Sequence, residues 1–82
     1  MTHPSGVLRV GDTVVWRGGW GSESPRLATV KRLEVTTGKR QKWGGKEASY
    51  VDWSVVRANR VVVDLDNGHW AYGEQIAPAE QP

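Results

Sequence analysis

The chain contains 82 residues, which is the length of one small domain with a single hydrophobic core. Hydrophobic residues make up 38% of it and charged residues 24%, a balance typical of folded chains rather than disordered ones. The absence of cysteine excludes disulfide bonds and thiolate metal sites and favours a cytoplasmic location. No apolar run of about 18 residues is present, so we expect neither a membrane span nor a signal peptide. Ten glycines and five tryptophans, with no phenylalanine, favour short strands and tight turns, and therefore an all-β fold with little or no helix.

The net charge is only +2, but the charged residues are unevenly placed. Residues 26–46 hold seven lysines and arginines against Glu34 alone, whereas residues 47–82 hold two basic residues against six acidic ones. This asymmetry indicates an anionic partner for the basic middle segment. A solvent-exposed hairpin arm without a ligand would have the same composition, so both interpretations stand.

The first predicted strand is GDTVVWR at 11–17, in which alternation puts Val14 and Trp16 on one face. The segment 18–26, GGWGSESPR, is rich in residues that favour turns. It is therefore expected to be a loop, and it carries Trp20.

A second strand is predicted over 27–36, but its apolar residues change parity in the middle. A strict period of two would point Arg32 into the core. A β-bulge near Lys31 and Arg32 would turn both charges outward and bend the strand, so we expect a bulge there.

The segment 38–48, GKRQKWGGKEA, has no apolar periodicity and is predicted to be an exposed loop or a mobile hairpin tip. The following segment, 51–59, allows two interpretations. Val51, Trp53 and Val55 alternate as in a strand, but the same residues could form one helical turn.

The clearest predicted element is a β-hairpin over 60–73, centred on Asn67 and Gly68. This pair favours a two-residue type I′ turn, because both central positions then need a positive φ. Such a turn would set Asp66 opposite His69, Leu65 opposite Trp70, Asp64 opposite Ala71 and Val63 opposite Tyr72. Trp70 and Tyr72 are therefore expected to pack in the core.

The predicted core contains three tryptophans and five aliphatic residues: Trp16, Trp53, Trp70, Val14, Val30, Leu33, Val63 and Leu65. Truncating a core tryptophan removes much of the stability available to a small domain. We therefore expect Trp70→Ala to unfold the protein. Gly73 would end the last strand of the hairpin, and Ile76 would return to the core.

The outer face of the predicted hairpin gathers Asp64, Asp66 and His69, the one cluster of carboxylates and imidazole in the sequence. Three donors on a flat face lack the pocket that catalysis needs, and the spacing does not fit a calcium loop. Asp66 is expected to support the turn, with His69 paired to it. No motif for a nucleophile, a P-loop or a dinucleotide site is present either. We expect no enzyme activity, no metal and no cofactor.

Aromatic residues interleaved with basic ones are the remaining functional signal. Exposed tryptophan stacks on bases while arginine and lysine meet phosphates, so this pattern predicts binding of single-stranded nucleic acid or a nucleotide. Alternatively, Trp20 and Trp43 could fold back to cover the ends of a small barrel. The candidate ligand-binding residues are Arg17, Trp20, Arg32, Lys39, Arg40, Lys42, Trp43 and Lys46.

The order GDTVVW, ATVKRLEV and VVVDLDNGHWAYGEQI resembles the Src-homology-3-like small barrels, including the KOW and Tudor groups. The resemblance implies a strongly bent, five-stranded β-barrel over residues 7–77, with flexible ends at 1–6 and 78–82. The KOW pattern itself is replaced here by the longer GGWGSESPRLATV, which argues against ribosome-style RNA binding.

WRGGWG and VVVDLDNGHWAYGEQI are also similar to small proteins encoded by bacteriophages and prophages. That resemblance implies an alternative function, the inhibition of a bacterial defence system. Such an inhibitor would dock on a host protein or sequester a nucleotide messenger. In the second case the pocket could form between two copies of the chain, as a homo-oligomer, because one barrel of this size has little interior.

Overall fold

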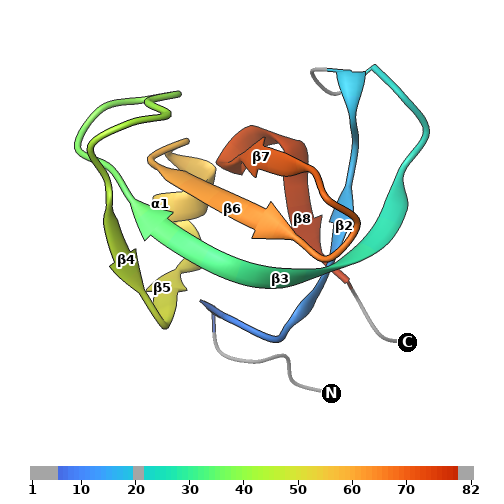
Figure 1. Cartoon of the computed structure of the whole chain (residues 1–82), viewed down its shortest axis with the longest axis horizontal. Helices are drawn as coiled ribbons and strands as arrows, with labels where there is room; N and C mark the ends of the chain where they lie inside the picture. The colour runs from blue at the N-terminus through green and yellow to red at the C-terminus, as the bar shows by residue number, and fades with distance from the viewer. Residues whose placement is uncertain (1–5, 20–21, 80–82) are drawn as a thin grey trace.

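The computed structural model describes residues 6–19 and 22–79 and shows an all-β protein with two sheets and one short helix (Figure 1). The expected flexible ends lie largely outside these residues. The elements in chain order are β1 (Val7–Arg9), β2 (Thr13–Trp16), β3 (Arg26–Val35), β4 (Lys46–Ala48), β5 (Tyr50–Asp52), α1 (Trp53–Arg57), β6 (Val61–Leu65), β7 (Trp70–Tyr72), the 3-10 helix η2 (Gly73–Gln75) and β8 (Ile76–Pro78).

The strand β3 is the centre of the larger sheet and runs across the molecule (Figure 1). Its first half pairs with β2, and its second half pairs with β6 on one side and β4 on the other. The register with β6 shifts between Val30 and Arg32, which confirms the predicted bulge. The bulge leaves Lys31 and Arg32 exposed while Val30 and Leu33 are both buried.

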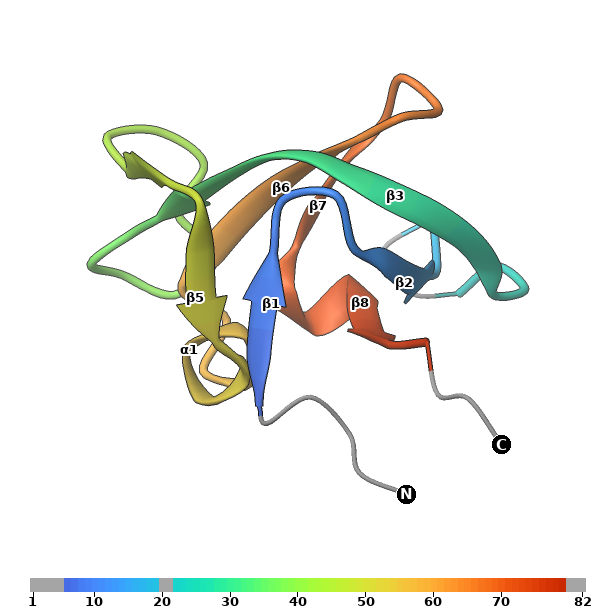
Figure 2. The ribbon, with the colours of Figure 1, turned by 90° about the horizontal axis from the view of Figure 1, so that it is seen from below.

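The predicted count of five strands is too low, because the described residues contain eight. The larger sheet has the order β7-β6-β3-β2-β8, with β4 also on β3, and its end strands β7 and β8 do not pair with each other, so no closed barrel forms. The remaining strands, β1 and β5, form a separate two-stranded sheet (Figure 2). Several strands have only three residues, which is too short for an alternation pattern to reveal.

The segment 51–59 contains the end of a strand followed by a helix, so both interpretations of its pattern apply to a part of it. The helix α1 ends in a Schellman motif: the N–H of Asn59 donates to Val56 O at 2.9 Å, and the N–H of Arg60 donates to Val55 O at 3.2 Å. This motif needs a left-handed residue after the helix. Asn59 supplies it with a φ of 63°.

The hydrophobic core confirms seven of the eight predicted core residues and excludes Trp70, which is 38% exposed. It also contains residues from short elements that sequence patterns did not single out for the core. These are Leu8, Ala28, Val51, Val56, Val61, Val62, Ala71 and Ile76.

The hairpin between β6 and β7 is correctly predicted, but its register is wrong by one residue. The N–H of Leu65 donates to His69 O at 2.8 Å, so the loop has three residues. Only Gly68 in this loop has a positive φ, 85°, which excludes a type I′ turn and fits a turn followed by a left-handed glycine. The observed pairs are Val62 with Tyr72, Val63 with Ala71 and Asp64 with Trp70.

This shift of one residue exchanges the two faces of β7. Ala71 is fully buried in the core, whereas Trp70 and Tyr72 lie on the outer face. The predicted core role of these two aromatic residues is therefore wrong. Gly73 and Ile76 are both buried, and the strand does end before Gly73, as predicted.

The register can be tested by comparing two tryptophans. Trp53 is only 7% exposed, so Trp53→Ala should lower the free energy of unfolding by about 3 to 5 kcal/mol. Trp70→Ala removes an outer-face side chain and should cost no more than about 1 kcal/mol. Chemical denaturation measures both variants. An equal, large loss for Trp70→Ala would contradict the observed register.

The close approach of η2 to α1 gives a second prediction. A Cβ atom on Gly73 would overlap the backbone carbonyl oxygen of Val56, which cannot move without shifting α1. Gly73→Ala should therefore destabilise the fold by about 1 to 3 kcal/mol or more. Gly68→Asn is the matched control, because position 68 is open and asparagine tolerates its left-handed φ. Thermal unfolding should separate the two variants clearly, and equal melting temperatures would contradict the close packing.

Candidate functional site

Five side chains form a continuous array of alternating rings and cations, which we call the aromatic face: Trp43, Lys42, Trp70, Tyr72 and Arg40. The ammonium of Lys42 lies 4.4 Å from the Trp43 ring centroid and 4.5 Å from that of Trp70. The rings of Trp70 and Tyr72 meet edge to face at 5.1 Å, and the Arg40 guanidinium lies 5.4 Å from the Tyr72 centroid. These distances are in the range of cation–π and aromatic contacts.

The tryptophans of the aromatic face are open to solvent. Trp43 is 77% exposed and Trp70 is 38% exposed. Trp43 therefore does not fold back to cover an end of the sheet, contrary to the alternative considered from the sequence. An exposed indole with a cation on one side still has a free surface on which a planar ligand can stack.

The loop that carries Lys42 and Trp43 is shaped by its own hydrogen bonds. The Thr36 hydroxyl donates to Gly38 O at 2.9 Å, and the Gly38 N–H donates to Oε1 of Gln41, also at 2.9 Å. The other end of the Gln41 side chain donates from Nε2 to Trp43 O at 2.8 Å. One glutamine thus connects the start of the loop to Trp43 and fixes the backbone on which both functional side chains stand.

The same loop is attached to the segment that follows α1. The Arg40 N–H donates to Asn59 O at 2.8 Å, and the Thr36 N–H donates to Arg60 O at the same distance. The guanidinium of Arg40 also pairs with Glu74 of η2, with Nε 3.3 Å from Oε2. These contacts hold the loop against β7 and η2, which places Lys42 over Trp70.

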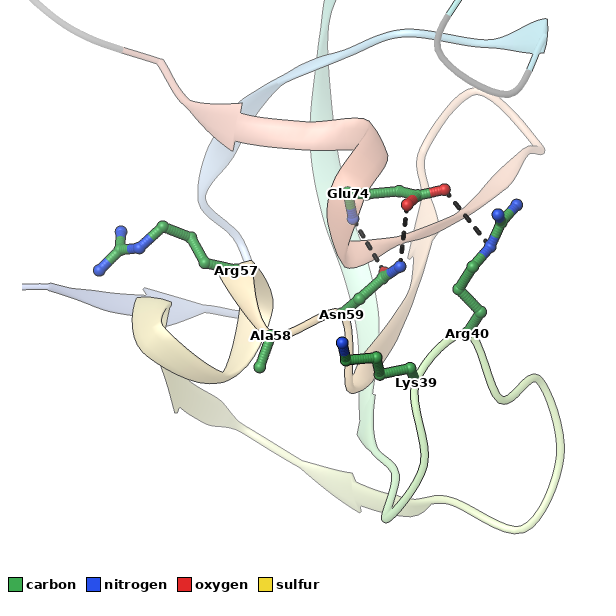
Figure 3. Close-up of a pocket in the computed structure, with 6 residues that line it drawn as sticks. All are labelled: Lys39, Arg40, Arg57, Ala58, Asn59 and Glu74. Carbon is green, nitrogen blue, oxygen red and sulfur yellow. Dashed lines mark hydrogen bonds and ion pairs between the residues drawn. The ribbon is translucent and has the colours of Figure 1, made fainter.

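Asn59 connects the three segments that meet here, as Figure 3 shows. Its side-chain amide donates to Glu74 Oε1 at 3.0 Å, and its Oδ1 accepts the Glu74 N–H at 3.0 Å. The residue is only 9% exposed, so these bonds satisfy polar groups that would otherwise be buried without partners. Glu74 is thereby oriented toward Arg40.

A polar hollow of about 340 Å³ lies beside the aromatic face and shares Arg40 with it. In Figure 3 the Lys39 ammonium points toward the end of α1, while the Arg57 guanidinium points away from the hollow. The hollow has no aromatic wall, so it offers charge but no stacking surface. Its lining residues are Lys39, Arg40, Arg57, Ala58, Asn59 and Glu74.

The remaining candidate residues from the sequence do not join the aromatic face. Arg32 lies among three carboxylates, at 2.6 Å from Glu34, 3.6 Å from Glu47 and 3.9 Å from Asp64, which compensate its charge. Lys46 is exposed at the start of β4.

Arg17 and Trp20 were also candidates. Arg17 follows β2, and its backbone exchanges hydrogen bonds with Gln75, donating to Gln75 O at 3.0 Å and accepting from Gln75 Nε2 at 3.1 Å. Its side chain is exposed. Trp20 lies outside the described residues.

Sequence reasoning missed Trp70 and Tyr72 as site residues, because the predicted register buried them. It also missed Asn59 and Glu74. An asparagine directly after a short helical segment is a recognised helix-ending signal and could have pointed to Asn59. Nothing in the pattern around Glu74 distinguishes it from other surface carboxylates.

The predicted cluster on the hairpin is dispersed into three separate contacts. Asp66 accepts the Thr29 N–H at 3.1 Å instead of supporting the turn, and the Asn67 side chain accepts the His69 N–H at 3.0 Å. The His69 ring packs on Trp16, with 4.8 Å between centroids, and is not paired to Asp66. Among residues 6–19 and 22–79, no group of three or more His, Cys, Asp or Glu side chains is arranged to hold a metal ion.

Within the part of the chain that the structure describes, no helix has the length and apolar character to cross a membrane. A scan against protein-family models, a search of curated proteins and a search of solved structures each gave no match. A proposed function therefore depends on the geometry of the aromatic face and its surroundings.

The role of Asn59 can be tested with two substitutions. Asn59→Gly keeps the left-handed backbone but removes both side-chain hydrogen bonds with Glu74, which should cost about 1 to 3 kcal/mol of stability. Asn59→Ala should cost about 1 to 2 kcal/mol more, because alanine is strained at a positive φ. Urea unfolding measures both. A glycine variant as stable as the parent would show that the Asn59 side chain does not hold these segments together.

Proposed function

We propose that this protein is a non-enzymatic binding module that takes single-stranded nucleic acid, or a nucleotide, on its aromatic face. The observation that carries this proposal is the position of the Lys42 ammonium over two exposed indole rings. Indole rings stack on any base because every base has a flat face, and an ammonium beside them meets the phosphate that follows.

The distribution of charge supports the same surface. Lys39, Lys42 and Lys46 all belong to the 39–46 segment, and no ion pair involves any of them within the described ranges. Arg32, by contrast, is surrounded by carboxylates. We infer that a phosphate backbone follows the loop and not the outer face of β3.

The bent path of β3 and the pairing of β2 with β8 support a further proposal about the fold, namely a Src-homology-3-like small barrel in general plan. Barrels of this kind leave their loops free for ligands, while the sheet supplies a rigid support. A loop held by Gln41 and Arg40 against the sheet fits that division.

The second candidate function is a phage-encoded inhibitor of a bacterial defence system that docks on a host protein in the cytoplasm. One observation favours it: a tryptophan as exposed as Trp43, rimmed by lysines and an arginine, is the type of residue that anchors protein interfaces. Docking would use the outer indole surface of Trp43 and would need no phosphate contact.

The proposed function predicts a specific pattern in a fluorescence titration with oligothymidylate. Trp43→Ala should weaken binding about tenfold or more, because each base–aromatic stack contributes about 1 to 3 kcal/mol. The logarithm of the affinity should fall with the logarithm of the salt concentration at a slope of about −2, as three lysines neutralise phosphates. Lys31→Ala is the matched control, since Lys31 is exposed at the bulge and contacts no ring, and its affinity should change little.

Three results would decide between the candidate functions. Absence of binding to oligonucleotides, duplexes and cyclic nucleotides at low salt would contradict nucleotide binding of every kind. Recovery of one stoichiometric protein from bacterial lysate, insensitive to nuclease and lost with Trp43→Ala, would support docking on a protein. Dimerisation on addition of a cyclic nucleotide would indicate sequestration of a messenger between two copies.

A further inference from the structure

The two indole rings of the aromatic face are separated by a gap of defined width. Since the Lys42 ammonium lies over both rings, the centroids of Trp43 and Trp70 can be no more than about 9 Å apart. A planar ring in contact with two flanking rings needs a gap of about 7 to 8 Å, from two van der Waals contacts of about 3.5 to 4 Å. The space that Lys42 now fills is therefore close to the thickness of one base.

We propose that Lys42 is a displaceable plug: one unpaired base enters between Trp43 and Trp70, and Lys42 moves out to bind the phosphate beside that base. This inference rests on the proposed function and specifies its ligand. The ligand is a nucleotide within a single strand, because the base must be unpaired to enter and the displaced ammonium needs a phosphate next to it.

The energetic exchange favours this displacement. A cation–π contact at an exposed site is weak, whereas a base stacked between two rings makes contact on both of its faces. The ammonium also gains a charged partner when it leaves the rings, since a phosphate replaces two neutral aromatic faces. Lys42 stands directly beside Trp43 in the chain, so its flexible stem can turn outward while the loop backbone stays in place.

The plug also makes Lys42 a specificity-determining residue. A neutral planar ligand would have to displace the ammonium without offering it a phosphate, so the native protein discriminates against uncharged ligands. A duplex would present its phosphates but not a free base. Only an unpaired base on a charged backbone satisfies both the rings and the lysine.

The test compares two ligands of the same base sequence, oligothymidylate and an uncharged peptide nucleic acid. Lys42→Ala opens the gap and removes one phosphate contact. It should weaken oligothymidylate binding severalfold, reduce the size of the salt slope by about 0.7, and strengthen peptide nucleic acid binding severalfold. Lys46→Ala is the matched control, because Lys46 contacts no ring in the described structure. It should weaken oligothymidylate binding without strengthening that of the peptide nucleic acid.

Nuclear magnetic resonance gives a direct readout of the plug. In the free protein the ε-methylene protons of Lys42 should be shifted upfield by the ring currents of both indoles. Saturation with oligothymidylate should remove this shift. A Trp70→Ala variant, which loses one of the two rings, should show a smaller upfield shift before any ligand is added.

The possible outcomes separate the two proposals. If the native protein binds oligothymidylate but Lys42→Ala leaves peptide nucleic acid binding unchanged or weaker, the plug is wrong and the binding function stands. Retention of the upfield shift at saturation would also overturn the plug. If the native protein binds no oligonucleotide at low salt, the proposed function fails and the plug fails with it.

Discussion

The bulge in β3 is the constraint on which the rest of the fold depends. One strand of ten residues must pair with β2 in its first half and with β6 and β4 in its second half. The shift between Val30 and Arg32 keeps apolar residues inward on both sides of the bend. Without it, the second half would direct Arg32 inward, and burying an unpaired guanidinium is too costly for so small a core. The bulge instead delivers Arg32 to a surface network with three carboxylates.

The turn between β6 and β7 then decides which residues are available for binding. A loop of three residues brings Ala71 into the core and directs Trp70 and Tyr72 outward. The small side chain at position 71 suits a space bordered by the valines of β6. Two large rings are left on the outer face, and the 36–45 loop lies over them through Lys42. The aromatic face is thus a direct result of the hairpin register.

The candidate site joins a ligand-facing loop to a rigid base, which is a common arrangement for recognition surfaces. Gln41 shapes the loop from within, while Arg40, Glu74 and Asn59 tie it to η2 and the end of α1. The only carboxylate near the loop cations in this assembly is Glu74, and it is occupied by Arg40 and Asn59. Lys39, Lys42 and Lys46 consequently keep their positive charge for a ligand.

The sequence by itself determined the all-β class, the bulge, the hairpin, most of the core and the basic, tryptophan-containing loop, because each leaves a local mark in spacing or composition. It did not reveal the three-residue strands, whose pairing depends on neighbours distant in the chain. The hairpin register was also beyond it: Asn67 and Gly68 fit turns of two or three residues, and packing of Ala71 against the core selected the longer one. Tertiary structure alone therefore placed Trp70 beside Trp43 and set Lys42 between them.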